Sequence, residues 1–426
     1  MPRRSSKAHQ HAPPPHGLIL GRALPERSRE VGFVGKPPRV SPGGELITYS
    51  GDAPIITVAA TGGGKTSGPV AVNARTYPGQ LICLDVKGEA YRLSAEHRRR
   101  MGQKVCVLDL RDNARAAGAL NPLDMAMMQG EEKIPIARAF AAELIERPPP
   151  GGAKDFFWID WAETMLTAAI AYLMLHHPDK CRLSELFDLY GEGDVPYKVA
   201  TCLDNVAEMN RATQTAWSSF LELPTDTTRP CVLASTTTAL RLFESDLVRR
   251  LTDDTTIDLK GLVAGKPMSI FIIVPPHRIR AYAPLLRLWL SGLMNLLSTR
   301  EGAPRLPTLM MVDEAAQLGR VDSFITAMTL MRGYGVRLWS FWQAASQLEI
   351  YGTDARSIID NAGVVQIFGL RNHRAAAEAA KLVGGISPEA LLGMGAEEQM
   401  VMVEGSPPSL CRQIRYYNDQ MFSEQR

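Results

Sequence analysis

One glycine-rich stretch, residues 59–66, constrains the fold of this chain more than any other part of its sequence. It reads Ala-Ala-Thr-Gly-Gly-Gly-Lys-Thr and directly follows the apolar run 55–58, which is typical of a short buried strand. In such a loop, successive backbone N–H groups and the N-terminus of the following helix hold phosphate oxygens. Lys65 is placed to reach the β- and γ-phosphates of a nucleotide, and the Thr66 hydroxyl to ligate Mg²⁺.

The stretch departs from the usual pattern at one position, because Ala59 stands where a glycine is expected. A glycine-rich turn that binds no nucleotide is therefore the alternative, and other parts of the chain have to supply the rest of a nucleotide site. The residues predicted to bind the nucleotide here are Thr61, Gly62, Gly63, Gly64, Lys65 and Thr66.

Size and composition indicate a globular protein with more than one compact unit. The 426 residues exceed what one hydrophobic core usually organises, and 45% of them are apolar and 22% charged. Residues 1–50 carry eight Lys or Arg against three Glu, although the formal net charge of the whole chain is only +2. This basic arm can contact nucleic acid or anionic lipid, but a solvated tail fits the charge equally well.

Cysteine usage and hydropathy favour a cytoplasmic protein. Six cysteines occur without a C-x-x-C pair, and no window of about 18 uncharged apolar residues exists. We therefore expect no zinc site, no disulfide framework and no membrane-spanning helix in a reducing compartment. Residues 1–16 lack the apolar segment of a signal peptide and are expected to be disordered.

The order of apolar patterns predicts an α/β fold with an insertion. From residue 54 onward, strand-like runs alternate with helical spacing, which favours a mainly parallel central sheet with crossover helices. Residues 134–250 interrupt this order with helical spacing alone. We predict three parts: a basic, partly disordered N-terminal arm at 1–50, a nucleotide-binding domain at 51–133 and 251–426, and an all-α insertion domain at 134–250.

Individual elements follow from the same patterns. Residues 121–124 (Asn-Pro-Leu-Asp) predict a turn, and Trp158 and Trp161 lie at helical spacing that favours a core role over base stacking. The predicted strands are 55–58, 81–85, 105–110, 269–274, 309–312, 336–342, 364–368, 399–403 and 413–417.

Two adjacent carboxylates, Asp313 and Glu314, follow the apolar run 309–312. At the carboxyl end of a buried strand, Asp313 can hold Mg²⁺ and Glu314 can polarise an attacking water molecule. Burying both side chains without a metal or a base role would be costly. An exposed acidic cap between a strand and a helix is the alternative.

The next predicted strand adds two further candidates. It ends in Gln343, whose amide can sense a γ-phosphate or position water, although such a Gln in isolation is an ordinary surface residue. Arg332 lies in the loop that enters this strand, where it can reach a neighbouring subunit's nucleotide as an arginine finger. Other arginines compete for that role: Arg320, Arg337 and Arg371.

These motifs together resemble the TraG/TraD-type coupling ATPases, which serve conjugation and type IV secretion. The resemblance runs in the family's order from about residue 17 to residue 422. It is carried by the glycine loop and by the segments 85–89 (DVKGE), 102–105 (GQKV), 121–124 (NPLD), 157–158 (FW), 312–319 (VDEAAQLG), 343–352 (QAASQLEIYG) and 415–419 (RYYND).

The resemblance implies a RecA-like P-loop ATPase domain with an inserted all-α domain, assembled as a homo-hexamer. It implies that ATP hydrolysis delivers a DNA–relaxase complex or protein effectors to a type IV secretion channel, with single-stranded DNA as a partner. By motif it assigns ATP and Mg²⁺ to Lys65 and Thr66, the metal also to Asp313, the base to Glu314, the sensor to Gln343 and the finger to Arg332.

Typical members of this family begin with transmembrane helices, and the sequence shows none. We therefore expect a cytoplasmic protein that is peripheral at the inner membrane through a membrane-anchoring partner. Two other functions stay open for the sequence: a non-hydrolysing recruitment adaptor on the same fold, and a RecA-like DNA helicase or packaging motor.

Overall fold

The computed structural model describes residues 17–24, 44–111, 118–130, 132–145 and 156–425. Residues 1–16, which the sequence predicts to be disordered, and most of the predicted basic arm lie outside these ranges. Within the described ranges, no helix has both the length and the apolar character that crossing a membrane requires.

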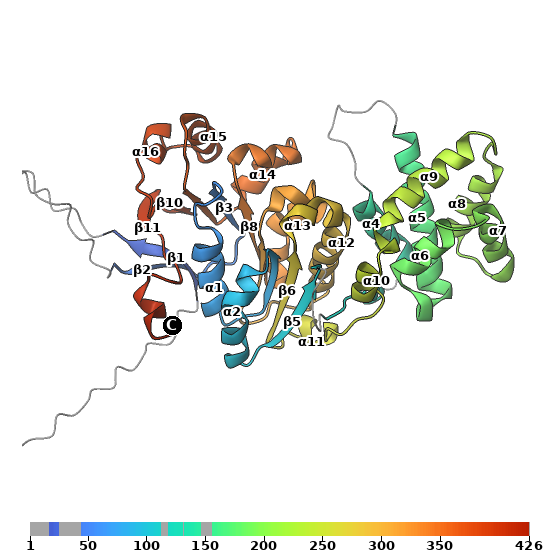
Figure 1. The fold of residues 1–426 in the computed structure, drawn as a ribbon, viewed down its shortest axis with the longest axis horizontal. Coiled ribbons are helices and arrows are strands. Elements are labelled where there is room, and N and C mark those ends of the chain that lie inside the picture. Colours follow the sequence, from blue (N-terminus) through green and yellow to red (C-terminus); the bar gives the residue numbers. More distant parts are fainter. Residues whose placement is uncertain (1–16, 25–43, 112–117, 131, 146–155, 426) are drawn as a thin grey trace, which may run out of the picture.

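Eleven strands of the described chain form one mixed sheet in the order β2-β1-β11-β10-β9-β3-β8-β7-β4-β6-β5 (Figure 1). Neighbouring strands from β9 to β5 are parallel, and those from β2 to β9 are antiparallel. The strands are β1 (Leu18–Ala23), β2 (Leu46–Tyr49), β3 (Ile55–Ala59), β4 (Leu81–Val86), β5 (Lys104–Asp109), β6 (Met268–Val274), β7 (Thr308–Val312), β8 (Val336–Trp342), β9 (Val364–Phe368), β10 (Glu398–Val403) and β11 (Ser409–Arg412).

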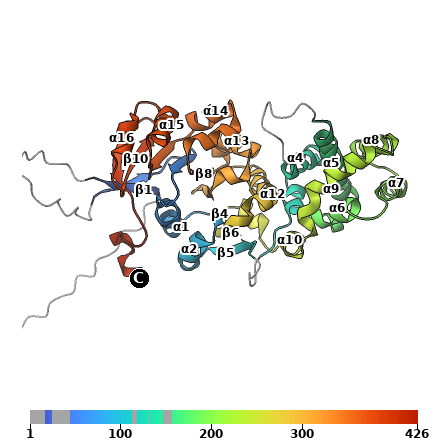
Figure 2. The same cartoon turned by 45° about the horizontal axis from the view of Figure 1, so that its top comes forward.

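Helices cover both faces of the parallel part, which is why its strands read as continuous apolar runs. All six residues of β4 are buried: Ile82 and Leu84 join one hydrophobic cluster with α3, α12 and α13, and Cys83 joins another with α1 and α2. Figure 2 shows the sheet between these two helical layers. The helices concerned are α1 (Ala71–Thr76), α2 (Glu89–Arg100), α3 (Pro122–Met127), α12 (Ile279–Leu297) and α13 (Asp322–Thr329).

A group of helices between β5 and β6 in the sequence lies at the end of the molecule remote from β1 and β2 (Figures 1 and 2). Its centre is α5, whose residues from Met165 to Met174 are buried. The group consists of α4 (Lys133–Leu144), α5 (Phe157–His176), α6 (Leu183–Tyr190), α7 (Val195–Asn205), α8 (Arg211–Glu222), α9 (Thr228–Leu240) and α10 (Asp246–Thr252). The domain boundaries at 133/134 and 250/251 stay predictions.

The antiparallel half joins the two ends of the described chain. Strand β1 pairs with β11, and the Asn73 side chain on α1 accepts from the Ile19 N–H at 2.8 Å and donates to its carbonyl at 2.9 Å. The Arg22 guanidinium donates to both carboxylate oxygens of Asp419 at 2.7 Å. Residues near the C-terminus are thereby held against the helix that follows the glycine loop.

Most predicted strands are confirmed within two residues, and α5 begins at Phe157 with Trp158 and Trp161 packed against the core. The predicted strand at 413–417 is wrong, because the sheet strand β11 ends at Arg412 and the chain then crosses over residue 67. The predicted turn at 121–124 is the start of α3, with the Asn121 side chain accepting from the Leu123 N–H. The remaining described elements are α11 (Leu259–Val263), α14 (Asp354–Asp360), α15 (His373–Val383) and α16 (Pro388–Leu392), plus short η segments.

Candidate functional site

Three neighbouring parallel strands, β3, β8 and β7, end at one edge of the sheet and place the candidate residues together. In the register, Val58 pairs with Trp342 and Val312 with Ser340, so the chain leaves the three strands at nearly the same level. The glycine loop follows β3, Gln343 follows β8, and the acidic pair follows β7. Parallel strands bring their carboxyl ends to one edge, and ligands of open α/β sheets bind there.

The glycine loop has the backbone geometry of a phosphate cradle. Gly62 and Gly64 have φ values of 78° and 99°, in the left-handed region that favours glycine. The buried Lys65 ammonium donates to the Ala59 carbonyl at 2.8 Å and lies 3.7 Å from the Glu314 carboxylate. Thr66 opens a π-helical turn, η1 (Thr66–Val70), so its hydroxyl sits at the start of the helix that follows the loop.

Glu314 and Gln343 contact each other beside this lysine. Glu314 has a φ of 53°, an uncommon left-handed conformation for a non-glycine residue, and strain of this kind concentrates at functional sites. The Gln343 amide donates to the Glu314 carboxylate at 2.6 Å, and the Gln347 side chain in turn accepts from the Gln343 backbone N–H at 2.8 Å. A lysine, a carboxylate and an amide thus form one contact chain across three strand ends.

Asp313, which precedes Glu314 in the sequence, is buried. Burial, together with the neighbouring Glu314 carboxylate, raises the pKa of Asp313 from 3.8 to about 7, although Lys65 opposes the shift. A divalent cation would favour the charged carboxylate. Within the described residues no group of three or more His, Cys, Asp or Glu is placed to hold a metal ion. The Asp313 carboxylate and the Thr66 hydroxyl are oxygen donors of the kind that Mg²⁺ accepts beside substrate phosphates.

Asp85 is a further acidic residue at this edge that the sequence analysis did not assign to the site. It is the penultimate residue of β4 and lies level with Asp313, because Leu84 pairs with Val312. One carboxylate oxygen accepts from the Tyr91 N–H at 2.7 Å; the other is buried without a hydrogen-bond partner among the described residues, and burial raises the pKa of Asp85. The signal was available, since an Asp ends the apolar run 81–84 as Asp313 ends the run 309–312.

Arg332 is the predicted site residue that the structure does not bring to this edge. It precedes β8, and its guanidinium forms an ion pair with Asp52, which precedes β3, at 2.5 Å. Both therefore lie at the amino edge of the sheet, and β8 alone separates Arg332 from Gln343 by roughly 20 Å. Arg332 is 57% exposed, so its side chain is accessible to another molecule.

The competing arginines have partners within the chain. Arg320 pairs with Asp322 and Asp354, and Arg337 is buried with its guanidinium on the Gly51 carbonyl. Arg371, just after β9, donates to the Thr61 carbonyl of the glycine loop at 2.8 Å.

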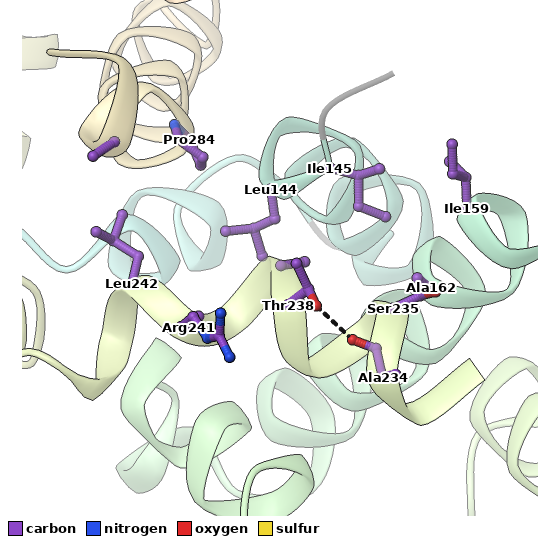
Figure 3. Close-up of a pocket in the computed structure, with 12 residues that line it drawn as sticks. Leu144, Ile145, Ile159, Ala162, Ala234, Ser235, Thr238, Arg241, Leu242 and Pro284 are labelled. Atoms are coloured by element: carbon purple, nitrogen blue, oxygen red, sulfur yellow. Dashed lines mark hydrogen bonds between the residues drawn. The ribbon is translucent and has the colours of Figure 1, made fainter. Parts of the chain in front are cut away.

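A pocket of about 660 Å³ lies away from the loop, between the helical group and the start of α12 (Figure 3). Its lining is mostly apolar, with Leu144, Ile145, Leu242 and Pro284 around it and Arg241 as its cation. Apart from Arg241, the polar side chains of the lining are Ser235 and Thr238, and none of the predicted site residues borders the pocket. The loop, rather than this pocket, is the candidate nucleotide site.

Comparison with known proteins identifies relatives along most of the chain. Protein VirD4 of Agrobacterium fabrum is 26% identical over 417 residues, covering 89% of this chain and 61% of that protein. The conjugal transfer protein TraG of Escherichia coli is 22% identical over 359 residues, covering 79% of this chain and 56% of that protein. The chain thus spans about 60% of the length of the VirD4 relatives that it matches.

A solved structure with the same fold is the plasmid coupling protein TrwB in complex with the ATP analogue ADPNP. It has a TM-score of 0.68 and 16% identity, and the match covers 86% of each chain. This likeness confirms the RecA-like fold predicted from the sequence.

The model of one protein family matches residues 22–387, which include the glycine loop, the acidic pair and Gln343. The resemblance stated from the motifs alone is therefore confirmed. This chain belongs to the type IV secretory system conjugative DNA transfer family.

Proposed function

We propose that this chain is an ATP-hydrolysing coupling protein of a type IV secretion or conjugation system. The observation that carries the proposal is the contact chain from Lys65 through Glu314 to Gln343 at the ends of three adjacent strands. Packing alone gives no reason to place a buried ammonium, the carboxylate of a residue with left-handed backbone geometry, and an amide together at one edge of the sheet. Hydrolysis of a nucleotide polyphosphate requires these three groups together.

The proposed role of each residue follows from its place in the series of contacts from Lys65 through Glu314 to Gln343. The backbone N–H groups of residues 62–66 cradle the phosphates, and Lys65 moves its charge from the Ala59 carbonyl to the β/γ-phosphates. Mg²⁺, held by Thr66 and Asp313, neutralises phosphate charge when bound. Glu314 orients and deprotonates the attacking water, while Gln343 holds Glu314 and senses the γ-phosphate. The complexes of TrwB with ADPNP and with ADP and Mg²⁺ support these ligands.

Arg332 acts in this proposal as an arginine finger on the neighbouring subunit's nucleotide. Its distance from the loop within one chain excludes action on its own site, whereas its exposure at the opposite edge suits a head-to-tail contact between copies. A closed ring of such contacts is the proposed homo-hexamer. The ion pair with Asp52 holds the side chain until a neighbouring site offers phosphate charge.

Partners and location are proposed from the family. Its description, conjugative DNA transfer, and the names of the relatives support single-stranded DNA, a relaxase or protein effectors, and a type IV secretion channel as partners. We place the chain at the cytoplasmic face of the inner membrane, bound through a membrane-anchoring partner. In this proposal residues 51–133 and 251–426 form the motor, and the insertion at 134–250 contacts cargo.

The experiment that tests this function measures ATP hydrolysis by the purified chain with and without single-stranded DNA. We expect turnover that DNA stimulates, that Lys65→Ala removes, and that Glu314→Gln lowers by about 10²–10⁴-fold while ATP still binds. Unchanged hydrolysis by Lys65→Ala would remove the core of the proposal. A non-hydrolysing adaptor is the competing function, and it predicts that Glu314→Gln leaves cargo transfer in cells unchanged.

A further inference from the structure

The segment that follows β11 crosses directly over the glycine loop. The Tyr416 N–H donates to the Ser67 carbonyl at 3.0 Å, and a Cβ atom added to Gly68 would meet the Ile414 carbonyl oxygen at 3.1 Å. Farther along, Asp419 is fixed by Arg22. The segment 414–419 is therefore held against the first turn after the loop at its start and against β1 at its end.

Arg415 is the cation of this segment, and it lies on the loop. Its guanidinium donates to the Gly63 carbonyl at 3.4 Å, and its Cζ atom is 3.1 Å from where a Cβ of Gly64 would be. Its Nε atom is buried without a hydrogen-bond partner, and no carboxylate lies within ion-pair distance among the residues that the structure describes. The side chain thus keeps positive charge and donor capacity beside a phosphate cradle.

Tyr417 extends this arrangement with an aromatic ring. Its hydroxyl accepts from Arg415 at 3.0 Å, and its ring stands edge-on to Tyr416, with the centroids 5.3 Å apart. Tyr416 is itself covered by the Arg75 guanidinium, 5.8 Å from the ring centroid. Tyr417 is 44% exposed, so part of this residue is accessible to a ligand close to the loop.

The sheet order shows which end of a nucleotide this surface would meet. Lys65 and Glu314 mark the γ-phosphate end, on the side of β8 and β7. The segment 414–419 comes from β11, on the other side of β3 in the sheet. A nucleotide whose γ-phosphate lies against Glu314 therefore directs its α-phosphate and nucleoside toward the segment 414–419.

We propose that Arg415 and Tyr417 form the nucleoside end of the nucleotide site. Arg415 donates to the α-phosphate or the ribose, where a charge-assisted hydrogen bond is strong, and Tyr417 stacks on the base. The inference rests on the proposed ATPase function and deepens it. Tyr417 differs from an ordinary exposed tyrosine because its hydroxyl accepts a hydrogen bond from Arg415, which itself contacts the glycine loop.

Binding measurements with two ligands separate the nucleoside end from the phosphate end. We would titrate ADP and inorganic tripolyphosphate, both with Mg²⁺, into the wild type, Tyr417→Ala and Tyr417→Phe. Tyr197→Ala, which removes a 70% exposed tyrosine from the helical group, is the matched control. We expect Tyr417→Ala to weaken ADP about 10-fold and tripolyphosphate less than about 2-fold. Tyr417→Phe, which keeps the ring but loses the hydroxyl that accepts from Arg415, should weaken ADP less than Tyr417→Ala does.

Kinetics test Arg415 in the same way. Arg415→Ala should raise the KM for ATP by about 10-fold and leave kcat within about 2-fold, because the arginine contacts the part of ATP that does not react. Arg415→Lys, which keeps the positive charge but lacks the planar, two-pronged guanidinium, should have a KM between those of the wild type and Arg415→Ala. An equal loss in kcat would assign Arg415 to the support of the loop and overturn its proposed contact with the nucleotide.

The outcomes also distinguish this inference from the proposed function. If the wild type binds ADP in a Lys65-dependent way and Tyr417→Ala binds it equally well, this inference fails and the ATPase proposal stands. Parallel weakening of ADP and tripolyphosphate by Tyr417→Ala would likewise overturn the stacking role. If the wild type binds neither ligand, the ATPase proposal fails as well.

Discussion

Asp313→Asn should stabilise the nucleotide-free protein while removing its activity. The buried Asp313 carboxylate is influenced by two other carboxylates, those of Glu314 and Asp85, and by one ammonium, that of Lys65; burial and Glu314 raise its pKa from 3.8 to about 7. The folded chain therefore holds a proton between about pH 4 and pH 7 that the unfolded chain has released. Stability of the wild type then falls as pH rises through this window.

The size of the effect follows from the shift. Above pH 7 both states are ionised, and the shift of about 3 units corresponds to about 4 kcal/mol of lost stability. An asparagine has a similar shape and cannot be charged, so its variant should avoid most of this cost at pH 8. For a cooperative unit of about 400 residues, 4 kcal/mol corresponds to a rise in melting temperature of roughly 5 °C.

Thermal unfolding of the nucleotide-free protein at pH 4.5 and pH 8 would measure this. We expect the gain at pH 8 to shrink toward pH 4.5, and Mg²⁺ with ADP to stabilise the wild type more than Asp313→Asn. Asp226→Asn, which removes the same charge from an exposed position on the helical group, should leave the melting temperature unchanged at both pH 4.5 and pH 8. An Asp313→Asn protein less stable than the wild type at pH 8 would refute the account of this carboxylate.

Three further changes test other contacts. Gln343→Ala should lower kcat by about 10–100-fold with little change in ATP affinity, since it removes a hydrogen bond to the Glu314 carboxylate; an equal loss of binding, measured by titration, would speak against this. Arg332→Ala should abolish turnover and still bind ATP, and mixing it with Glu314→Gln subunits should restore some activity; no rescue at any ratio would count against a finger acting between subunits. Asn73→Ala should cost about 2–5 kcal/mol in urea unfolding because it unpairs both backbone groups of the buried Ile19, whereas Asn361→Ala, at an exposed helix end, should cost far less.

The sequence predicts the parallel half of the sheet well, because each of its strands is buried on both faces and reads as an apolar run between breaks. Strands β8 and β9 coincide with their predicted bounds. The antiparallel half is harder: the sequence predicts neither β1 nor the four-residue β2, and the predicted strand 413–417 begins four residues after β11 does. Apolar residues around Tyr416 resemble a strand, but their burial comes from packing over the loop.

The candidate site divides in a similar way. Lys65, Glu314 and Gln343 each follow a predicted strand, and parallel strands bring such positions together by topology. Asp85, at the end of the predicted strand 81–85, lies at the same edge of the sheet and can be placed there from the sequence in the same way. The contacts of Arg371 and Arg415 with the glycine loop cannot be predicted from the sequence. They depend on where β9 and β11 join the sheet, and local patterns do not encode strand order.

The central claim is that one site in this chain turns ATP binding into work on DNA as part of a ring. The most direct measurement is the ATPase rate of the purified wild type together with its oligomer size, with and without single-stranded DNA. The account predicts that DNA raises both together, and that Glu314→Gln assembles on DNA with ATP while hydrolysing it at least about 10²-fold more slowly. A chain that stays monomeric on DNA, or hydrolyses ATP equally fast with Glu314→Gln, would contradict it.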